Sequence, residues 1–393
     1  MHIGFTREQL QLRDELRDYF GKLMTPERTA ALNDSSSEYG SGTTYRDTVR
    51  QIGKDGWLGV GWPKEYGGQD RTMIEQMIFS DEASRAGAPL PLLTIGTVGP
   101  TIMEYGSQEQ KDFFLPKILG GELHFAIGYS EPDAGTDLAS LTTKAVRDGD
   151  EYVINGSKMW TSLIEHADYI WLACRTDPDA PKHKGISVLA VPTGLPGFSW
   201  SPVRTLSGAT TSQTFYEDMR VPTSTLVGQE NNGWRLVTGQ LNRERVALCS
   251  PVGVQNALAV TEAWAKETKL PDGRRVIDQE WVRANIGRVH AKVEFLKLIN
   301  WKIAWGVSKG VSPADASATK VFGTEFATEA YRLLMECFGE DAYIKGDSPS
   351  AVAKGRVERA MRGALILTFG GGTNEIQRDI IAMVGLGMPR APR

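Results

Sequence analysis

The spacing of the apolar residues changes twice along the chain, and this change constrains the fold more than any other feature. Helical spacing dominates residues 1–120, and it returns from Gly233 onward. Between these parts lie short runs rich in β-branched and aromatic residues, such as DYIWLACR and GISVLAVP. We therefore predict an α+β chain with an N-terminal helical domain over 1–120, a middle β domain over 121–230 and a C-terminal helical domain over 231–393.

Two dipeptides in the middle domain are typical of tight turns. Asp148-Gly149 and Asn155-Gly156 lie on either side of the run EYVI, which predicts a strand between two hairpin turns. A β domain of roughly a hundred residues with such strands is consistent with a sandwich or a barrel.

Helices are predicted on both sides of this domain. Thr6 and Gln9 have the spacing of a capping box, and the helix that follows has an apolar face formed by Leu12, Leu16, Phe20 and Met24. The polar stretch NDSSSEYGSGTT at 33–44 predicts a surface loop. After Gly233 the spacing predicts a four-helix bundle and a last helix from Thr373, with the four long helices over 233–268, 279–309, 312–338 and 350–368.

Composition argues against several classes of protein. The 393 residues carry 44 Lys and Arg against 48 Asp and Glu, a net charge of −4, so no basic surface for nucleic acid is indicated. No apolar run has the length of a membrane span, and the first ten residues lack the apolar core of a signal peptide. Cys174, Cys249 and Cys337 are widely spaced and odd in number, which favours buried thiols, no zinc site and a cytoplasmic location.

The segment AIGYSEPDAGTDLASLTTKAVRDGDEYVINGSKMWTS, residues 126–162, groups the side chains that could bind a ligand. It has short hydroxyls at Ser130, Thr136, Thr161 and Ser162. Gly135 allows close approach to the backbone, and Trp160 offers a flat face for stacking. The combination suits a planar polar heterocycle with a phosphate tail. The alternative is a Gly/Pro loop followed by a core tryptophan. Neither a dinucleotide-binding nor a P-loop glycine motif occurs.

A second segment, LTFGGGTNEIQR at 367–378, has three glycines at the start of the last predicted helix. Bare backbone N–H groups there could bind an anion. Glycine has no side chain that could react, so a reactive residue would have to come from elsewhere.

Together these segments resemble the acyl-CoA dehydrogenases, which use FAD to desaturate acyl-CoA thioesters. YSEPDAGTD, DGDEYVINGSKMW and GGTNEIQRDIIA carry the resemblance, which covers essentially the whole chain. It implies a helical domain, a β domain and a helical bundle. It also implies FAD as cofactor, an acyl-CoA substrate and an electron-transfer flavoprotein or similar acceptor.

The resemblance assigns roles by position. It implies contacts to the flavin and to the mouth of the substrate channel by Tyr129, Ser130, Gly135 and Thr136. It implies contacts to the other face and the edge of the flavin ring by Trp160, Thr161 and Ser162. The family usually has Ile-Thr after this tryptophan, so either hydroxyl could be the donor here. At the start of the last helix, it implies that the flavin's linker is held by Thr373 and Glu375.

In many members the catalytic glutamate stands where this chain has Gly371. Glu244 lies instead on a predicted apolar stripe with Val237, Leu241 and Leu248, all within about 60° on a helical wheel. A buried carboxylate is costly without a partner, so a structural ion pair with Arg243, Arg245 or another chain is the alternative.

The resemblance favours Glu244 as the general base, because a minority of members, the isovaleryl type, supply the base from this position and carry a small residue at the other. It also implies that the Gly371 N–H binds the thioester carbonyl. Arg245 is placed near the CoA portion of the channel, with a surface ion pair as the alternative.

Two motifs of homomeric members are not intact here. The segments that hold a neighbouring subunit's adenine and pyrophosphate correspond to KLPDGRR at 269–275 and LMECFGEDA at 334–342. This favours a homologous partner chain. The chain resembles one subunit of the α2β2 acyl-CoA dehydrogenases that act on steroid side chains in cholesterol-degrading bacteria, which implies a sterol-derived acyl-CoA. The alternatives are a non-catalytic structural subunit, or an acyl-CoA oxidase or flavin monooxygenase of the same fold.

Overall fold

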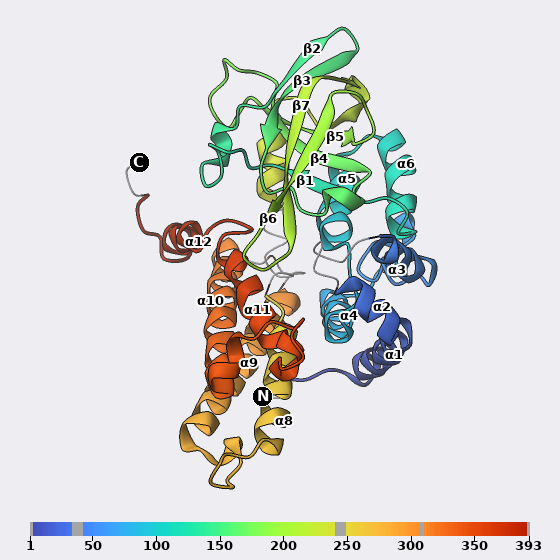
Figure 1. Ribbon diagram of the computed structural model, residues 1–393. Helices are drawn as coiled ribbons and strands as arrows, with labels where there is room; N and C mark the ends of the chain where they lie inside the picture. Colours follow the sequence, from blue (N-terminus) through green and yellow to red (C-terminus); the bar gives the residue numbers. More distant parts are fainter. Residues whose placement is uncertain (1–2, 34–41, 240–248, 307–309, 311, 391–393) are drawn as a thin grey trace. The chain divides into compact units, whose positions relative to one another are not determined.

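The computed structural model describes residues 3–33, 42–239, 249–306, 310 and 312–390 (Figure 1). The chain forms two compact units, Met1–Glu244 and Arg245–Arg393. The part of the loop predicted at 33–44 that covers 34–41 lies outside the described residues, as do Glu244 and Arg245. Within the described ranges, no helix is both long and apolar enough to cross a bilayer.

The first unit begins with helices, as predicted. They are α1 (Arg7–Leu23), α2 (Pro26–Leu32), α3 (Thr44–Lys54), α4 (Met73–Ala86), α5 (Gly99–Tyr105) and α6 (Gln108–Leu119). The capping box of α1 is confirmed: the Thr6 hydroxyl accepts from Gln9 N–H, and the Gln9 side chain accepts from Thr6 N–H. Of its predicted face, Leu12, Leu16 and Phe20 are buried, while Met24 caps the helix C-terminus. This face packs α1 against α4.

A sheet follows the helices, in the green part of Figure 1. Its strands are β1 (Phe125–Gly128), β2 (Lys144–Asp148), β3 (Glu151–Lys158), β4 (Tyr169–Arg175), β5 (Ile186–Pro192), β6 (Phe198–Arg204), β7 (Thr210–Pro222) and β8 (Leu226–Val227). The order is β6-β7-β3-β2-β4-β5-β8, and β1 pairs with β4 in parallel. The apolar runs in β4 and β5 are buried almost throughout, so the sheet core lies under these strands.

One of the two predicted turns is wrong. Gly149 and Asp150 do connect β2 to β3, but Asn155-Gly156 lies inside β3, where the pairing with β7 shifts register by a bulge. Gly156 has φ 149°, and an added Cβ would lie 2.6 Å from the Thr143 hydroxyl. Asn155 exchanges two hydrogen bonds with Asp218, through its amide NH₂ and its side-chain oxygen. Long-range pairing therefore turns a hairpin-type dipeptide into a bulge.

The second unit is helical. Its helices are α8 (Val252–Glu267), α9 (Glu280–Gly306), α10 (Pro313–Phe338), α11 (Arg356–Ala364) and α12 (Asn374–Ile380). Helix α10 contacts α8, α9, α11 and α12, and the buried apolar residues gather around it. Cys174, Cys249 and Cys337 are free and buried, which confirms the predicted buried thiols.

Two predicted helices have other bounds. The helix predicted over 233–268 is interrupted, because 249–251 are not helical and α8 begins after Pro251. Proline has no N–H to donate and clashes with the preceding turn. The helix predicted from 350 begins at Arg356, after Gly355 with φ 63°. Gly355 packs so closely on Gly346 that a Cβ would lie 2.4 Å from its nitrogen.

Candidate functional site

The predicted ligand loop connects β1 to β2 and starts at Tyr129. Tyr129 is buried, Ser130 is half-buried, and Gly135 and Thr136 are exposed. The Ser130 carbonyl accepts from the N–H of Met159, at 2.8 Å, so the loop is joined to the chain just before Trp160. The structure thus brings the two halves of the predicted flavin segment together.

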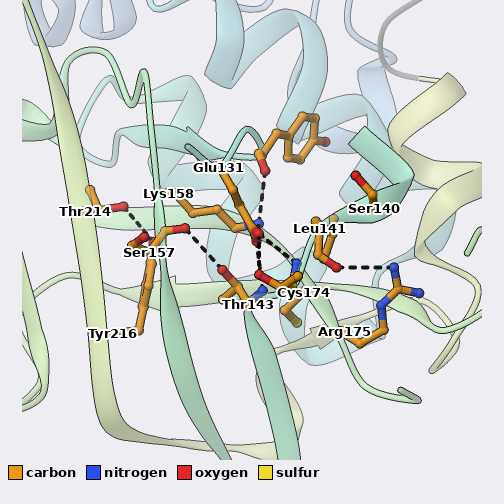
Figure 2. Close-up of polar contacts among 12 residues, drawn as sticks. Glu131, Ser140, Leu141, Thr143, Ser157, Lys158, Cys174, Arg175, Thr214 and Tyr216 are labelled. Carbon is orange, nitrogen blue, oxygen red and sulfur yellow. Dashed lines mark hydrogen bonds and ion pairs between the residues drawn. The ribbon is translucent and has the colours of Figure 1, made fainter. Parts of the chain in front are cut away.

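A buried ion pair underlies this loop. The Lys158 ammonium, fully buried at the end of β3, donates to Glu131 at 2.8 Å and to the Tyr129 carbonyl at 3.0 Å (Figure 2). Glu131 also accepts from the N–H and hydroxyl of Thr142 and from the N–H of Thr143. One carboxylate therefore ties the start of the loop to its end.

The charge states of this pair follow from its surroundings. Burial alone raises the pKa of Glu131, but the adjacent Lys158 charge and the hydrogen-bond donors lower it to about 2. Burial lowers the pKa of Lys158, and Glu131 opposes that shift. The carboxylate is therefore ionised at neutral pH and serves to position the loop.

The sequence analysis did not identify this pair, although Glu131 and Lys158 both lie within residues 126–162. The available signal was two opposite charges within one ligand-binding segment. Arg175 was missed as well: its guanidinium donates to the carbonyls of Ala139 and Leu141, at 2.7 and 3.3 Å, and so holds the short 3-10 helix of the loop.

Trp160, Thr161 and Ser162 follow β3 and differ in exposure. Trp160 has φ 66°, unusual for a residue with a side chain, and is 58% exposed. Thr161 is 0% exposed, and its hydroxyl has no hydrogen-bond partner among the described residues. Ser162 is half-buried, with its hydroxyl 3.3 Å from that of Thr211. The backbone is fixed here because Thr161 N–H donates to the Ser212 carbonyl, at 2.8 Å.

In the second unit, the glycine segment leads into α12. Gly371 and Gly372 have φ 69° and 87°, in the left-handed region that favours glycine. Thr373 is the N-cap of α12, and its hydroxyl accepts from the Ile376 N–H. Glu375 is exposed in the first turn. Helix α12 has only 7 residues and is followed by a π-helical turn at Ile381–Gly385, so its dipole is a weak source of anion binding.

The predicted base and its neighbour, Glu244 and Arg245, lie outside the described residues. Of the predicted apolar stripe, Val237 is the member that lies among the described residues, and it is buried, at 0% exposed. At 269–275, Arg274 pairs with Asp272 and Arg275 pairs with Asp278, at 2.7 and 2.8 Å.

Comparison with known proteins gives matches along the whole chain. Family models described as the N-terminal, middle and C-terminal domains of acyl-CoA dehydrogenase match residues 6–122, 126–219 and 231–386. The chain is 62% identical to acyl-CoA dehydrogenase FadE26 of Mycobacterium tuberculosis over 400 residues, covering 100% of both.

Two solved structures are similar to this chain over its whole length. A chain of the ChsE4-ChsE5 complex from Mycobacterium tuberculosis is 62% identical, with a TM-score of 0.94 and 100% of both chains covered. A chain of the Tcur3481-Tcur3483 steroid ACAD is 48% identical, with a TM-score of 0.93 and the same coverage. With three domain models in order and full-length relatives at this identity, the chain belongs to the acyl-CoA dehydrogenases, a family of generally FAD-dependent enzymes.

Proposed function

We propose that this chain is an FAD-dependent dehydrogenase subunit that desaturates the CoA thioester of a sterol side-chain acid, together with a homologous partner chain. The full-length match to a chain of a two-component steroid ACAD carries this proposal. The electron acceptor would be an electron-transfer flavoprotein or a similar protein.

The residues after β3 fit a planar polar ring. Trp160 exposes a large aromatic face, and Ser162 beside it has a half-buried hydroxyl that can make a further hydrogen bond. Because Thr161 is fully buried, a group bound outside the sheet would contact the Ser162 hydroxyl and not that of Thr161. We therefore assign the hydroxyl contact to Ser162 and backbone support to Thr161.

The other proposed flavin contacts are those that the resemblance implies. The loop held by Glu131 and Lys158 supplies Tyr129, Ser130, Gly135 and Thr136. The start of α12 supplies Thr373 and Glu375 for the linker. When bound, FAD would accept the β-hydride of the acyl chain.

The proposed chemistry of the protein concerns the α-proton. Glu244 would remove it from the thioester as general base, and the raised pKa expected in apolar surroundings would suit that role. The Gly371 N–H would donate to the thioester oxygen as negative charge develops there. A glycine can serve in this way because only its backbone is used. Arg245 would contact the CoA portion.

Substitution of the base tests the proposal. Glu244→Gln keeps the size of the side chain and removes the carboxylate, so flavin reduction by a sterol side-chain acyl-CoA should slow by ~10²–10⁴-fold. The measurement is anaerobic stopped-flow bleaching of the flavin, with Glu262→Gln as control, because Glu262 is an exposed partner of Lys266 on α8. Bleaching of Glu244→Gln at the wild-type rate would favour a structural subunit whose partner supplies the base. Oxygen consumption matched to turnover would favour an oxidase or a monooxygenase.

Flavin stoichiometry tests the partner. Because the adenine-side motifs are not intact, the chain alone should bind FAD poorly and gain it with a homologous partner, at one FAD per pair of chains. A homotetramer with a full flavin in every subunit would contradict the heteromer but not the family.

A further inference from the structure

The glycine loop, defined here as residues 368–373, is held from inside the second unit by a lysine. Lys320 lies on α10 and is 0% exposed. Its ammonium donates to the Gly372 carbonyl at 2.9 Å, to the Asn374 side-chain oxygen at 2.8 Å and, at a longer 3.4 Å, to the Thr368 carbonyl. An ammonium can donate three hydrogen bonds. The three acceptors named here lie in the glycine loop or in Asn374, the first residue of α12.

A second buried side chain holds the same loop. Gln377 on α12 is 0% exposed, and its amide NH₂ donates to the Gly371 carbonyl at 3.0 Å. It packs so closely that a Cβ on Gly372 would lie 2.6 Å from its nitrogen. A substituted residue at Gly372 would therefore displace Gln377 or the loop.

These contacts determine the direction of two backbone N–H groups, those of Gly372 and Thr373, and hold the chain directly after Gly371. Within one peptide plane, C=O and N–H point in opposite directions. Because Gln377 and Lys320 bind the carbonyls of Gly371 and Gly372 from the interior, the next N–H groups, of Gly372 and Thr373, point the other way. On the N-terminal side, Gly370 N–H donates to the Ile366 carbonyl at 3.0 Å. The Gly371 N–H thus lies between two anchored points.

Further contacts hold Asn374, one of the acceptors of Lys320. The amide NH₂ of Asn374 donates to the Thr324 hydroxyl and to Glu325 on α10, at 3.1 and 3.2 Å. Glu325 in turn pairs with Arg378 of α12 at 2.8 Å. The network joins α10 to the first turn of α12, so the loop is attached to the central helix of the unit.

A run of three glycines has more conformational freedom than any other tripeptide, so its N–H groups would not hold one direction without help. Donors that stabilise developing charge must be oriented before the reaction. We infer that Lys320, with Gln377, is a positioning residue that orients the Gly371 N–H toward the thioester oxygen. This inference rests on the proposed function of Gly371.

The test uses the flavin-loaded protein with its co-expressed partner chain. Lys320→Met keeps the length of the side chain and removes its donors, and Gln377→Met does the same at the second anchor. Lys302→Met is the control, because Lys302 is exposed and its pair with Asp315 lies at the surface. The FAD content of each variant is measured first. Two further quantities are measured with a sterol side-chain acyl-CoA carrying carbon-13 at the thioester carbonyl. They are the rate of flavin reduction and, in a Glu244→Gln background where the acyl chain is not desaturated, the infrared stretch of the bound carbonyl.

We expect Lys320→Met and Gln377→Met to reduce flavin ~10–10²-fold more slowly, as for a misplaced catalytic group. The carbonyl stretch should move back toward its value in free thioester, and FAD content should stay at the wild-type level. The control should match wild type in all three. If Lys320→Met does not fold, the flavin-reduction rate and the carbonyl stretch of Gln377→Met test the inference.

Three results would overturn the inference. The first is an unchanged stretch and rate in folded variants. The second is loss of FAD from the variants, which would assign the anchors to cofactor binding. The third is a wild-type protein that neither reduces its flavin nor shifts the carbonyl stretch, and this result alone would also overturn the proposed function.

Discussion

Removing the Lys158 ammonium should destabilise the first unit more than removing any surface lysine. In Lys158→Met the methionine fills most of the same space but leaves Glu131, only 6% exposed, without its ion partner. Loss of one partner of a buried pair typically costs about 3–5 kcal/mol. The pKa of Glu131 gives a consistent magnitude, because a shift from 4.5 to about 2 corresponds to roughly 3 kcal/mol of stability at neutral pH.

The pH dependence has a defined sign. The folded pKa of Glu131 lies below its unfolded value, so this stability is fully present above pH 4.5 and is lost as pH falls toward about 2. In Lys158→Met the pKa of Glu131 should rise, because burial remains and the neighbouring charge is gone. The difference in unfolding free energy between variant and wild type should therefore be largest at neutral pH and shrink in acid.

Urea unfolding followed by tryptophan fluorescence, at pH 7 and pH 4, measures this difference. The matched control is Lys182→Met, since Lys182 pairs with Asp137 at the same 2.8 Å but is 61% exposed, and such surface pairs contribute at most about 1 kcal/mol. Equal destabilisation by the two substitutions would refute the reasoning. Lys158→Met with Glu131→Gln should recover part of the loss, because the unpaired charge is then removed.

Two further predictions concern residues near this pair. Ser162→Ala should weaken FAD binding or shift the flavin spectrum, whereas Thr161→Val should change neither, because of these two residues only Ser162 can be reached from outside the sheet. Flavin titration of the complex measures both effects. A loss of FAD binding in Thr161→Val but not in Ser162→Ala would assign the contact to Thr161. Gly156→Ala should destabilise the protein by about 1–3 kcal/mol, because the added Cβ would lie within 2.8 Å of three Thr143 atoms. The measurement is the thermal unfolding midpoint. A midpoint equal to that of wild type would show that the bulge relaxes to accommodate the methyl group.

Much of the architecture could be predicted from local sequence signals. The capping box of α1 depends on two residues three positions apart, and the apolar runs of β4 and β5 require burial wherever they pair. Such signals act within a few residues, so no knowledge of distant contacts is needed. The same holds for the motifs that carry the resemblance to acyl-CoA dehydrogenases, which the comparisons confirm.

Features that depend on distant contacts could not be predicted in this way. Asn155-Gly156 reads locally as a turn, but its pairing with β7, more than fifty residues further on, makes it a bulge. Lys158 and Glu131 are 27 positions apart in the sequence, and only the folded loop brings them to 2.8 Å in a buried place. Lys320 stands about fifty residues before Gly372, whose carbonyl it binds. The sequence by itself determined the order of helical and β segments and the family of the chain, because these depend on periodicity and motif. Only the tertiary structure decided which charges are buried and which backbone groups they orient, because burial and hydrogen bonding arise when separate segments meet.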